Sequence, residues 1–182
     1  MKNKVFLAIL LLTPILVVTF SSLYFSLGYS PEGTKNNGIF FKSYFNFDQF
    51  STSKDNNLIE FEDGKWVMGV YITDPAKADA SLYLMRQLNV ALNRDIFRIK
   101  RAAFYNNDQL EKPIMDIQSE YPRMEIYKDQ TAVFFNSLQN NSALDLMSDN
   151  PIFLIDPYGR VVMYFDVDLD PKKILKDLKV LI

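Results

Sequence analysis

Asp74 and Lys77 are charged residues three positions apart in the stretch "TDPAKADA". A carboxylate and an amine at that spacing on a helical turn could share a proton and act as an acid–base pair. A solvated ion pair, worth about 0–1 kcal/mol, is the commoner role for such residues. We therefore assign neither residue to a catalytic site.

The chain of 182 residues contains no cysteine and no histidine. Thiol exchange, cysteine nucleophiles, metal sites built on thiolate or imidazole, and general acid–base catalysis by histidine all need these side chains. Carboxylate, lysine, tyrosine and hydroxyl groups remain, but no motif arranges them for a reaction. We expect no catalytic residue, no cofactor and no metal site, and therefore no enzyme activity.

Asp166, Asp168 and Asp170 alternate with apolar residues and resemble the start of a calcium-binding loop. Such a loop has glycine at its sixth position and glutamate at its twelfth, where this chain has Pro171 and Asp177. Exposed aspartates, the last of which caps a helix, explain the pattern better.

The charged residues are scattered, and the formal net charge is −2. Nucleic-acid binding needs a clustered positive face, so we expect no nucleic-acid partner. Hydrophobic residues make up 48% of the chain, and a chain of this composition forms a packed core rather than staying disordered.

The N-terminal segment carries no charge over the 23 positions from Val5 to Leu27. As a helix this stretch would reach about 34 Å, enough to cross a bilayer. Because Lys2 and Lys4 precede it, the positive-inside rule places the N-terminus in the cytoplasm. We predict that residues 1–28 form a single-pass anchor in a bacterial inner membrane, with the remainder in the periplasm.

A cleaved signal peptide is the alternative for this segment, with a weak cleavage site at Ser26-Leu27-Gly28. The apolar core of a signal peptide usually has only about 7–15 residues, which favours the anchor. Residues 29–60 are rich in turn residues and predict a linker that leads into the fold. The aromatic stretch "IFFKSYFNFDQF" within it could touch the membrane surface or, as we favour, pack as an edge strand.

Regular structure is predicted for residues 61–182. "KWVMGVYIT" is typical of a buried strand, and Asp74-Pro75 would then cap and begin a helix. "IFRIKRAAFY" predicts a second strand, and "DQLEKPIMDIQSEYP" predicts a helix with Pro113 near its start. "AVFFNSL" could be a strand or a helical turn.

The C-terminal part predicts a hairpin and a final helix. Two apolar runs flank the turn Asp156–Gly159, and Asp170-Pro171 then begins a helix. The order strand, helix, strand, helix, hairpin, helix predicts an α/β fold with a thioredoxin-like mixed β-sheet sandwiched by helices.

The stretches "WVMGVYI", "SLYLMRQLNVALNRD" and "FLIDPYGRVVMYFDVDLDPKKILKDLK" carry a family resemblance. With the N-terminal anchor, they make the chain similar to membrane-anchored SCO/SenC-type proteins, the thioredoxin-fold copper and thiol factors of cytochrome c oxidase assembly. The resemblance implies two cysteines near Asp74 and Ala78, and a histidine near the hairpin. None is present, so the resemblance implies the fold and the pathway but carries over neither copper binding nor disulfide exchange.

The thioredoxin-like fold also implies a groove beside Asn150-Pro151, where such folds often have a cis-proline. An ordinary trans proline at a strand start is the alternative. The candidate protein-binding groove comprises Thr73, Asp74, Lys77, Ala78, Asn150 and Pro151.

We expect a non-catalytic, membrane-anchored protein that assists respiratory oxidase assembly by binding an oxidase subunit or another assembly factor. A general periplasmic chaperone or tether, and an enzyme using carboxylate or lysine chemistry in the groove, are the alternatives.

Overall fold

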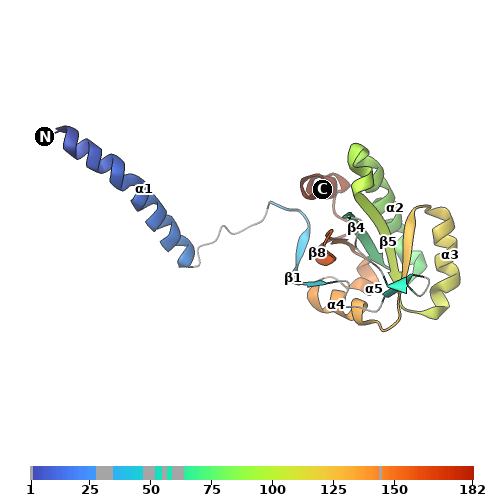
Figure 1. Ribbon diagram of the computed structural model, residues 1–182. Helices are drawn as coiled ribbons and strands as arrows, with labels where there is room; N and C mark the ends of the chain where they lie inside the picture. Colours follow the sequence, from blue (N-terminus) through green and yellow to red (C-terminus); the bar gives the residue numbers. More distant parts are fainter. Residues whose placement is uncertain (1, 28–34, 47–51, 55–56, 59–63, 144) are drawn as a thin grey trace. The chain divides into compact units, whose positions relative to one another are not determined.

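The computed structural model describes residues 2–27, 35–46, 52–54, 57–58, 64–143 and 145–182 (Figure 1). The chain divides into two units, Met1–Lys35 and Asn36–Ile182. The folded unit therefore begins before residue 61, where the sequence analysis placed the start of the domain. Parts of the predicted linker, including residues 29–34 and 47–51, lie outside the described residues.

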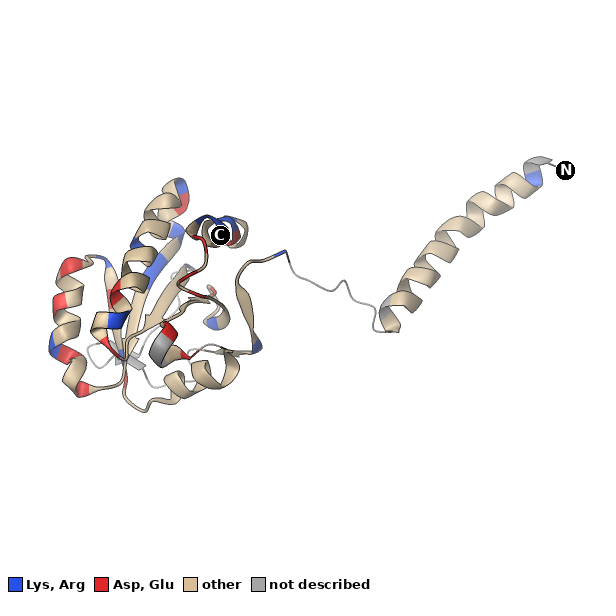
Figure 2. Ribbon diagram, turned by 180° about the vertical axis from the view of Figure 1, so that it is seen from behind, with Lys and Arg blue, Asp and Glu red and all other residues tan. Residues whose placement is uncertain are grey.

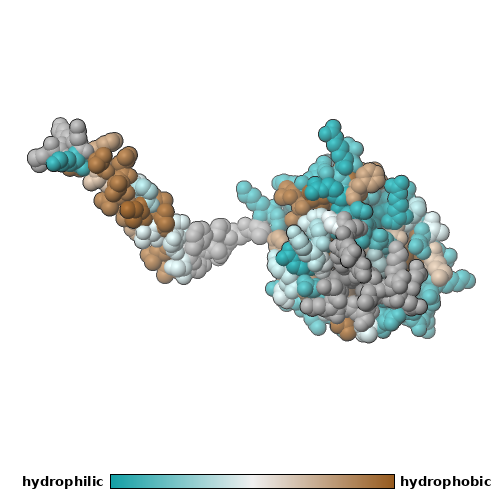
Figure 3. All heavy atoms as spheres, in the orientation of Figure 1, coloured by the Kyte–Doolittle hydropathy of each residue, from teal (hydrophilic) through white to brown (hydrophobic). Residues whose placement is uncertain are grey.

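The first unit contains the helix α1 (Lys2–Ser26), which has Pro14 in its interior. Its apolar stretch Lys4–Tyr24 has 21 residues and a mean hydropathy of 2.4, long and apolar enough to cross a membrane. Its surface is predominantly apolar (Figure 3). The Thr13 and Thr19 hydroxyls donate to carbonyl oxygens one turn earlier, at 2.7 and 2.8 Å. The helix thus satisfies these polar groups internally, as a lipid environment requires.

The second unit is built on a mixed sheet with the strand order β1-β8-β7-β4-β5-β6-β2-β3. Its strands are β1 (Ile39–Asn46), β2 (Thr52–Lys54), β3 (Asn57–Leu58), β4 (Trp66–Tyr71), β5 (Ile99–Tyr105), β6 (Met124–Asp129), β7 (Ile152–Ile155) and β8 (Arg160–Phe165). The central strands β4, β5 and β6 run parallel, and the other pairs are antiparallel. This confirms the predicted mixed sheet.

Helices cover both faces of this sheet. They are α2 (Pro75–Ala91), α3 (Glu111–Glu120), α4 (Val133–Asn141), α5 (Leu146–Asp149) and α6 (Pro171–Leu181), with short 3₁₀ segments η2 (Asn93–Arg98) and η3 (Asp108–Leu110). Helices α2, α3 and α6 contribute to one apolar cluster, whereas α4 and α5 contribute to the other. Successive residues of β4 alternate between the two clusters, because side chains of a strand point to opposite faces.

Several local predictions need correction. Residues 96–98 belong to η2 rather than to a strand, so β5 begins only at Ile99. The stretch "AVFFNSL", whose sequence allows a strand or a helical turn, lies in helix α4 apart from Ala132, its N-cap. Strand β6 was not predicted, because "MEIYKD" is short and largely polar. Its presence completes the run of three parallel strands.

The edge strand β1 is held by a buried carboxylate of α6. Asp177 is 4% exposed, and its oxygens accept hydrogen bonds from the backbone N–H groups of Asn37 and Gly38 at 2.6 and 2.8 Å. The Asn37 side-chain amide donates to the same carboxylate at 2.8 Å. Phe41 of β1 is buried in the core. The interpretation of this aromatic stretch as a packed edge strand is therefore correct for its described residues.

The C-terminal hairpin has the predicted turn. The backbone N–H of Gly159 donates to the carbonyl of Asp156 at 2.9 Å, and Gly159 adopts a positive φ of 78°. The Asp156 carboxylate accepts from the backbone N–H of Tyr158 and from the guanidinium of Arg160. These contacts fix the register in which β8 returns along β7.

Candidate functional site

The turn between β4 and α2 caps a helix. The Asp74 side chain accepts a hydrogen bond from the backbone N–H of Ala76 at 3.0 Å, and Pro75 occupies the first helical turn. Ala78, one turn later, is fully buried in the core, whereas Lys77 is exposed. The carboxylate thus performs the capping role that the sequence predicts.

Asn150 and Pro151 lie at the same end of the sheet as this turn. Strand β7 pairs antiparallel with β4, with Phe153 opposite Gly69, so the start of β7 adjoins the end of β4. The Ser81 hydroxyl of α2 donates to the carbonyl oxygen of Asn150 at 2.7 Å. The structure therefore brings the two halves of the predicted groove together. The Asn150–Pro151 peptide bond is trans, which answers the question that the sequence left open.

Unpaired polar atoms mark this end of the sheet. Asn150 is buried, has a positive φ of 39°, and neither polar atom of its side chain has a hydrogen-bond partner. The buried hydroxyl oxygen of Thr73, just after β4, also lacks a partner. Buried polar groups are paired in most proteins. Thr73 and Asn150 are thus two of the described residues that have a buried, unpaired side-chain atom, and both lie at this end of the sheet.

A buried tyrosine–aspartate pair supports the next part of the edge. The Tyr71 hydroxyl at the end of β4 donates to Asp129 at the end of β6, at 2.9 Å. Asp129 is fully buried and also accepts from the backbone N–H of Phe135, which ties it to the first turn of α4. Burial raises the pKa of Tyr71, and the Asp129 carboxylate raises it further. The hydroxyl therefore stays protonated and donates to the carboxylate.

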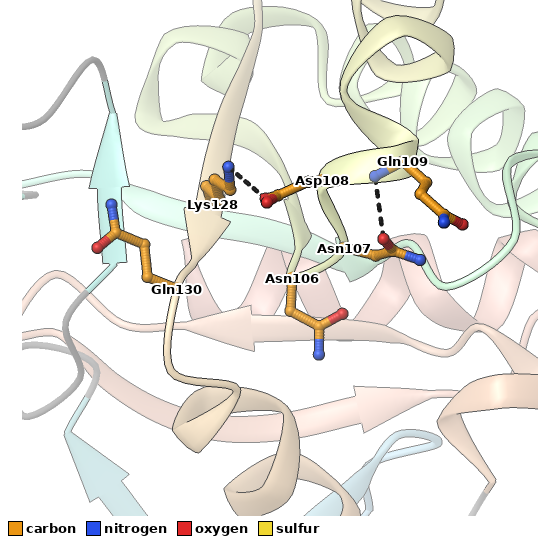
Figure 4. A pocket seen from close by; sticks show the side chains of 6 residues that line it. All are labelled: Asn106, Asn107, Asp108, Gln109, Lys128 and Gln130. Atoms are coloured by element: carbon orange, nitrogen blue, oxygen red, sulfur yellow. Dashed lines mark hydrogen bonds and ion pairs between the residues drawn. The ribbon is translucent and has the colours of Figure 1, made fainter.

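A shallow polar pocket of about 710 Å³ opens at the carboxyl ends of β5 and β6 (Figure 4). Its lining residues are Asn106, Asn107, Asp108, Gln109, Lys128 and Gln130. In Figure 4 the side chains come from the β5–α3 connection and from β6 and the loop after it. The carboxyl edge of parallel strands is the usual place for ligands in α/β sheets.

The lining of this polar pocket suits hydrogen bonding more than acid–base catalysis. Most of its side chains are amides, which offer both donors and acceptors. The Lys128 amine lies 2.6 Å from the Asp108 carboxylate, and this contact raises the pKa of Lys128. A lysine that serves as a general base needs a lowered pKa. The polar pocket can therefore bind peptide-like groups, but it contains no activated amine.

The residues of this pocket are not among those predicted from the sequence. Asn106 and Asn107 directly follow β5, and Lys128 and Gln130 flank the end of β6. The signal was the position of polar residues after two parallel strands. This position predicts a pocket only when residues 124–129 are known to form the strand β6.

Restoring a cysteine pair tests the geometry of the turn. Asp74 and Ala78 are one helical turn apart, with the Ala78 N–H donating to the Asp74 carbonyl at 3.1 Å. That spacing brings the two Cα atoms within about 4.4–6.8 Å, the usual range for a disulfide. We expect the Asp74→Cys/Ala78→Cys variant to form an intramolecular disulfide in mild oxidant, as measured by thiol labelling and mass spectrometry.

The helix N-terminus should also lower the pKa of at least one of the two thiols below about 8.5. The control variant Asp74→Cys/Ala80→Cys places its second thiol at an exposed position of α2, where we expect free thiols. Free thiols in the first variant, or crosslinks only between molecules, would contradict the alignment of this turn with a thiol site.

Comparison with known proteins identifies the fold family. A family model described as the transmembrane-like, thioredoxin-like C-terminal domain matches residues 66–182. No curated protein is significantly similar to the chain in sequence.

Several solved structures superimpose on the chain. ScoI of Bradyrhizobium japonicum, solved with copper bound, has 16% identity and a TM-score of 0.51, covering 82% of this chain and 100% of that chain. BsSco, described as a member of the Sco family of cytochrome c oxidase assembly proteins, has 13% identity and a TM-score of 0.53, covering 80% and 96%. A SCO1/SenC family lipoprotein from Bacillus anthracis has 14% identity and a TM-score of 0.54, covering 78% and 98%. These likenesses confirm the thioredoxin-like fold that the resemblance implied.

Copper ligation does not fit the residues at this turn. Ala78 offers only a methyl group, the Asp74 carboxylate caps α2, and the chain has no thiolate or imidazole. Copper sites in proteins rely on such soft or imidazole ligands. Among the described residues, no group of three or more His, Cys, Asp or Glu side chains is arranged to hold a metal.

Proposed function

The chain belongs to the family of transmembrane-like, thioredoxin-like proteins, and we propose that it is a non-catalytic, membrane-anchored protein of respiratory oxidase assembly. Its folded domain would bind another protein at the carboxyl edge of β4, β5 and β6. The partner would be a subunit of a cytochrome c oxidase or another assembly factor.

This proposal rests on a thioredoxin-like fold that has no thiol or imidazole group at the turn after β4. The cap at Asp74, the buried Ala78 and the Ser81–Asn150 hydrogen bond hold the turn after β4 beside the start of β7. Neither thiol nor imidazole chemistry is available there. A thioredoxin-like site without thiol or imidazole groups is suited to binding rather than to thiol or metal chemistry.

The polar pocket lies along the same edge of the sheet, at the carboxyl ends of β5 and β6. Its side-chain amides can pair with the backbone N–H and C=O groups of an extended peptide. These features support a protein segment, rather than an apolar small molecule, as the ligand.

The proposal also assigns the protein to oxidase assembly and places its folded domain in the periplasm. The link rests on the Sco-type neighbours, one of which is described as belonging to a family of cytochrome c oxidase assembly proteins. The location rests on the apolar helix Lys4–Tyr24 and on the lysines at its N-terminal end. An uncleaved anchor in the inner membrane would tether the domain in the periplasm, beside membrane-embedded oxidase subunits.

Two other functions remain as alternatives. A general periplasmic chaperone or tether would use the same groove without dependence on an oxidase. An enzyme that uses carboxylate or lysine chemistry is less well supported, because Asp108 raises the pKa of Lys128 instead of lowering it.

Site-specific crosslinking in native membranes tests the proposal. A photoreactive amino acid at Gln109, in the polar pocket, should crosslink to an oxidase subunit or assembly factor, identified by mass spectrometry. The same group at Lys176, exposed on α6, is the control and should yield no such product. Crosslinks to many unrelated exported proteins would favour the chaperone instead. The absence of any product specific to Gln109 would contradict binding at this edge.

A further inference from the structure

A second pocket lies at the opposite end of the parallel strands, where β4 and β5 begin. It has a volume of about 170 Å³ and is lined by Lys65, Asn89, Ile96, Phe97, Ile99, Lys100, Arg101 and Arg123. Basic residues come from the segments that precede or begin three neighbouring strands, β4, β5 and β6. Figure 2 shows Lys and Arg residues at this end of the domain, where α2 ends and β5 begins.

Arg101 is the buried member of this basic pocket. Arg101 is only 6% exposed. One terminal nitrogen, Nη2, donates to the carbonyl oxygen of Pro122 at 2.9 Å. The other, Nη1, is buried without a hydrogen-bond partner. A buried guanidinium normally pairs with a carboxylate or another anion, whereas among the described residues this one donates to a neutral carbonyl.

The neighbouring charges do not compensate Arg101. Burial lowers the pKa of the Arg101 guanidinium, and the like charges of Arg86 and Arg123 lower it further. Glu125 lies 3.6 Å from the Lys100 amine and offsets that charge, and Lys65 also has an interaction of its own. Within the described part of the chain, the guanidinium groups of Arg101 and Arg123 have no carboxylate partner.

We propose that this basic pocket binds a phosphate group. Two guanidinium groups and the nearby lysines supply the planar and point-charge donors with which proteins hold tetrahedral oxyanions. The volume admits a phosphate with a small substituent but not a large ligand. A bound dianion would give Arg101 and Arg123 the counter-charge that the described residues do not provide.

The rim of the basic pocket indicates a phosphate carried on an organic group. Ile96 and Phe97 form an apolar part of the lining, and Phe97 is 76% exposed. An exposed aromatic ring beside a phosphate site can contact the organic part of a phosphomonoester or the glycerol region of a lipid headgroup. A soluble phosphomonoester and a lipid headgroup present the same phosphate chemistry to the two arginines, and the experiment below distinguishes between these two ligands.

Calorimetric titration of the full-length protein in nonionic detergent tests this site. We expect saturable binding of inorganic phosphate and of glycerol 3-phosphate. The Arg123→Gln variant should weaken both by about tenfold or more, because it removes one charge-assisted pairing. The control variant Lys176→Gln removes an exposed cation outside the pocket and should leave the affinities unchanged. Arg101→Lys, which keeps the buried charge, should also weaken binding, because it loses the fork-shaped donor.

Bilayer nanodiscs distinguish the two sources of phosphate. If the headgroup of an anionic lipid is the ligand, phosphatidylglycerol discs should suppress binding of glycerol 3-phosphate relative to phosphatidylcholine discs. Equal binding in both discs identifies a soluble phosphomonoester. Either result supports the site. The proposal is overturned if neither probe binds up to about 10 mM, or if Lys176→Gln weakens binding as much as Arg123→Gln does.

Discussion

Replacing Asp177 by alanine should lower the free energy of unfolding by about 3 kcal/mol or more. The carboxylate is almost completely buried and accepts hydrogen bonds from the backbone of Asn37 and Gly38 and from the Asn37 side chain. Its removal leaves these donors without their acceptor and releases the start of β1. Urea denaturation of the full-length protein in detergent, followed by the fluorescence of Trp66, measures the loss.

The matched control is Asp168→Ala, which removes an exposed aspartate of the turn that leads to the same helix. Its effect should stay within about 0.5 kcal/mol. Hydrogen exchange adds a second measurement, since β1 should lose protection in Asp177→Ala while β4 and β5 keep theirs. Equal stability losses in the two variants would show that the buried carboxylate does not hold β1.

Replacing Gly69 by alanine should destabilise the domain by about 3 kcal/mol, because an added methyl group has no space. A Cβ atom at Gly69 would lie 2.7 Å from Cζ of Phe153 and 3.1 Å from Cε2 of Phe104. Both rings are completely buried, and they contact each other with a centroid separation of 5.6 Å. Neither ring can move without displacing its neighbours in the core.

Gly64→Ala is the control, because Gly64 has a positive φ of 64° and open space around it. The Gly64→Ala substitution should lower the free energy of unfolding by about 1 kcal/mol, through the backbone conformation alone. Adding Phe153→Leu to Gly69→Ala should recover part of the lost stability, since the smaller side chain makes room for the methyl group. The steric explanation would be contradicted if Gly69→Ala lowered the free energy of unfolding by no more than Gly64→Ala does.

Local chemistry made several elements predictable from the sequence. Asp74-Pro75 and Asp170-Pro171 each place a capping carboxylate before a residue with a helix-compatible φ, and both begin helices in the structure. The turn Asp156–Gly159 likewise specifies the hairpin. The long uncharged N-terminal stretch specifies a helix of membrane-spanning length. In each case the physical cause lies within a few neighbouring residues or within one continuous segment.

The missing reactive groups were also readable from the sequence alone. A chain without cysteine and histidine cannot perform thiol exchange or bind copper through thiolate and imidazole. This exclusion does not depend on the three-dimensional structure. The placement of Asp74 and Ala78 on a strand-to-helix turn depended on the β4–α2 pattern, which is again local.

Only the tertiary structure decided where distant residues meet. The pairing of Asp177 with Asn37 and Gly38 spans about 140 positions of the chain, as the separations of 140 and 139 show. The Tyr71 side chain of β4 reaches Asp129 of β6 across the intervening strand β5, and the strand order makes this contact possible. The polar and basic pockets likewise gather residues from successive strands at opposite ends of the sheet. A short polar strand such as β6 gains its stability from its partner in the sheet rather than from its own residues. The positions of these pairs and pockets therefore follow from the strand order and register, which no local pattern encodes.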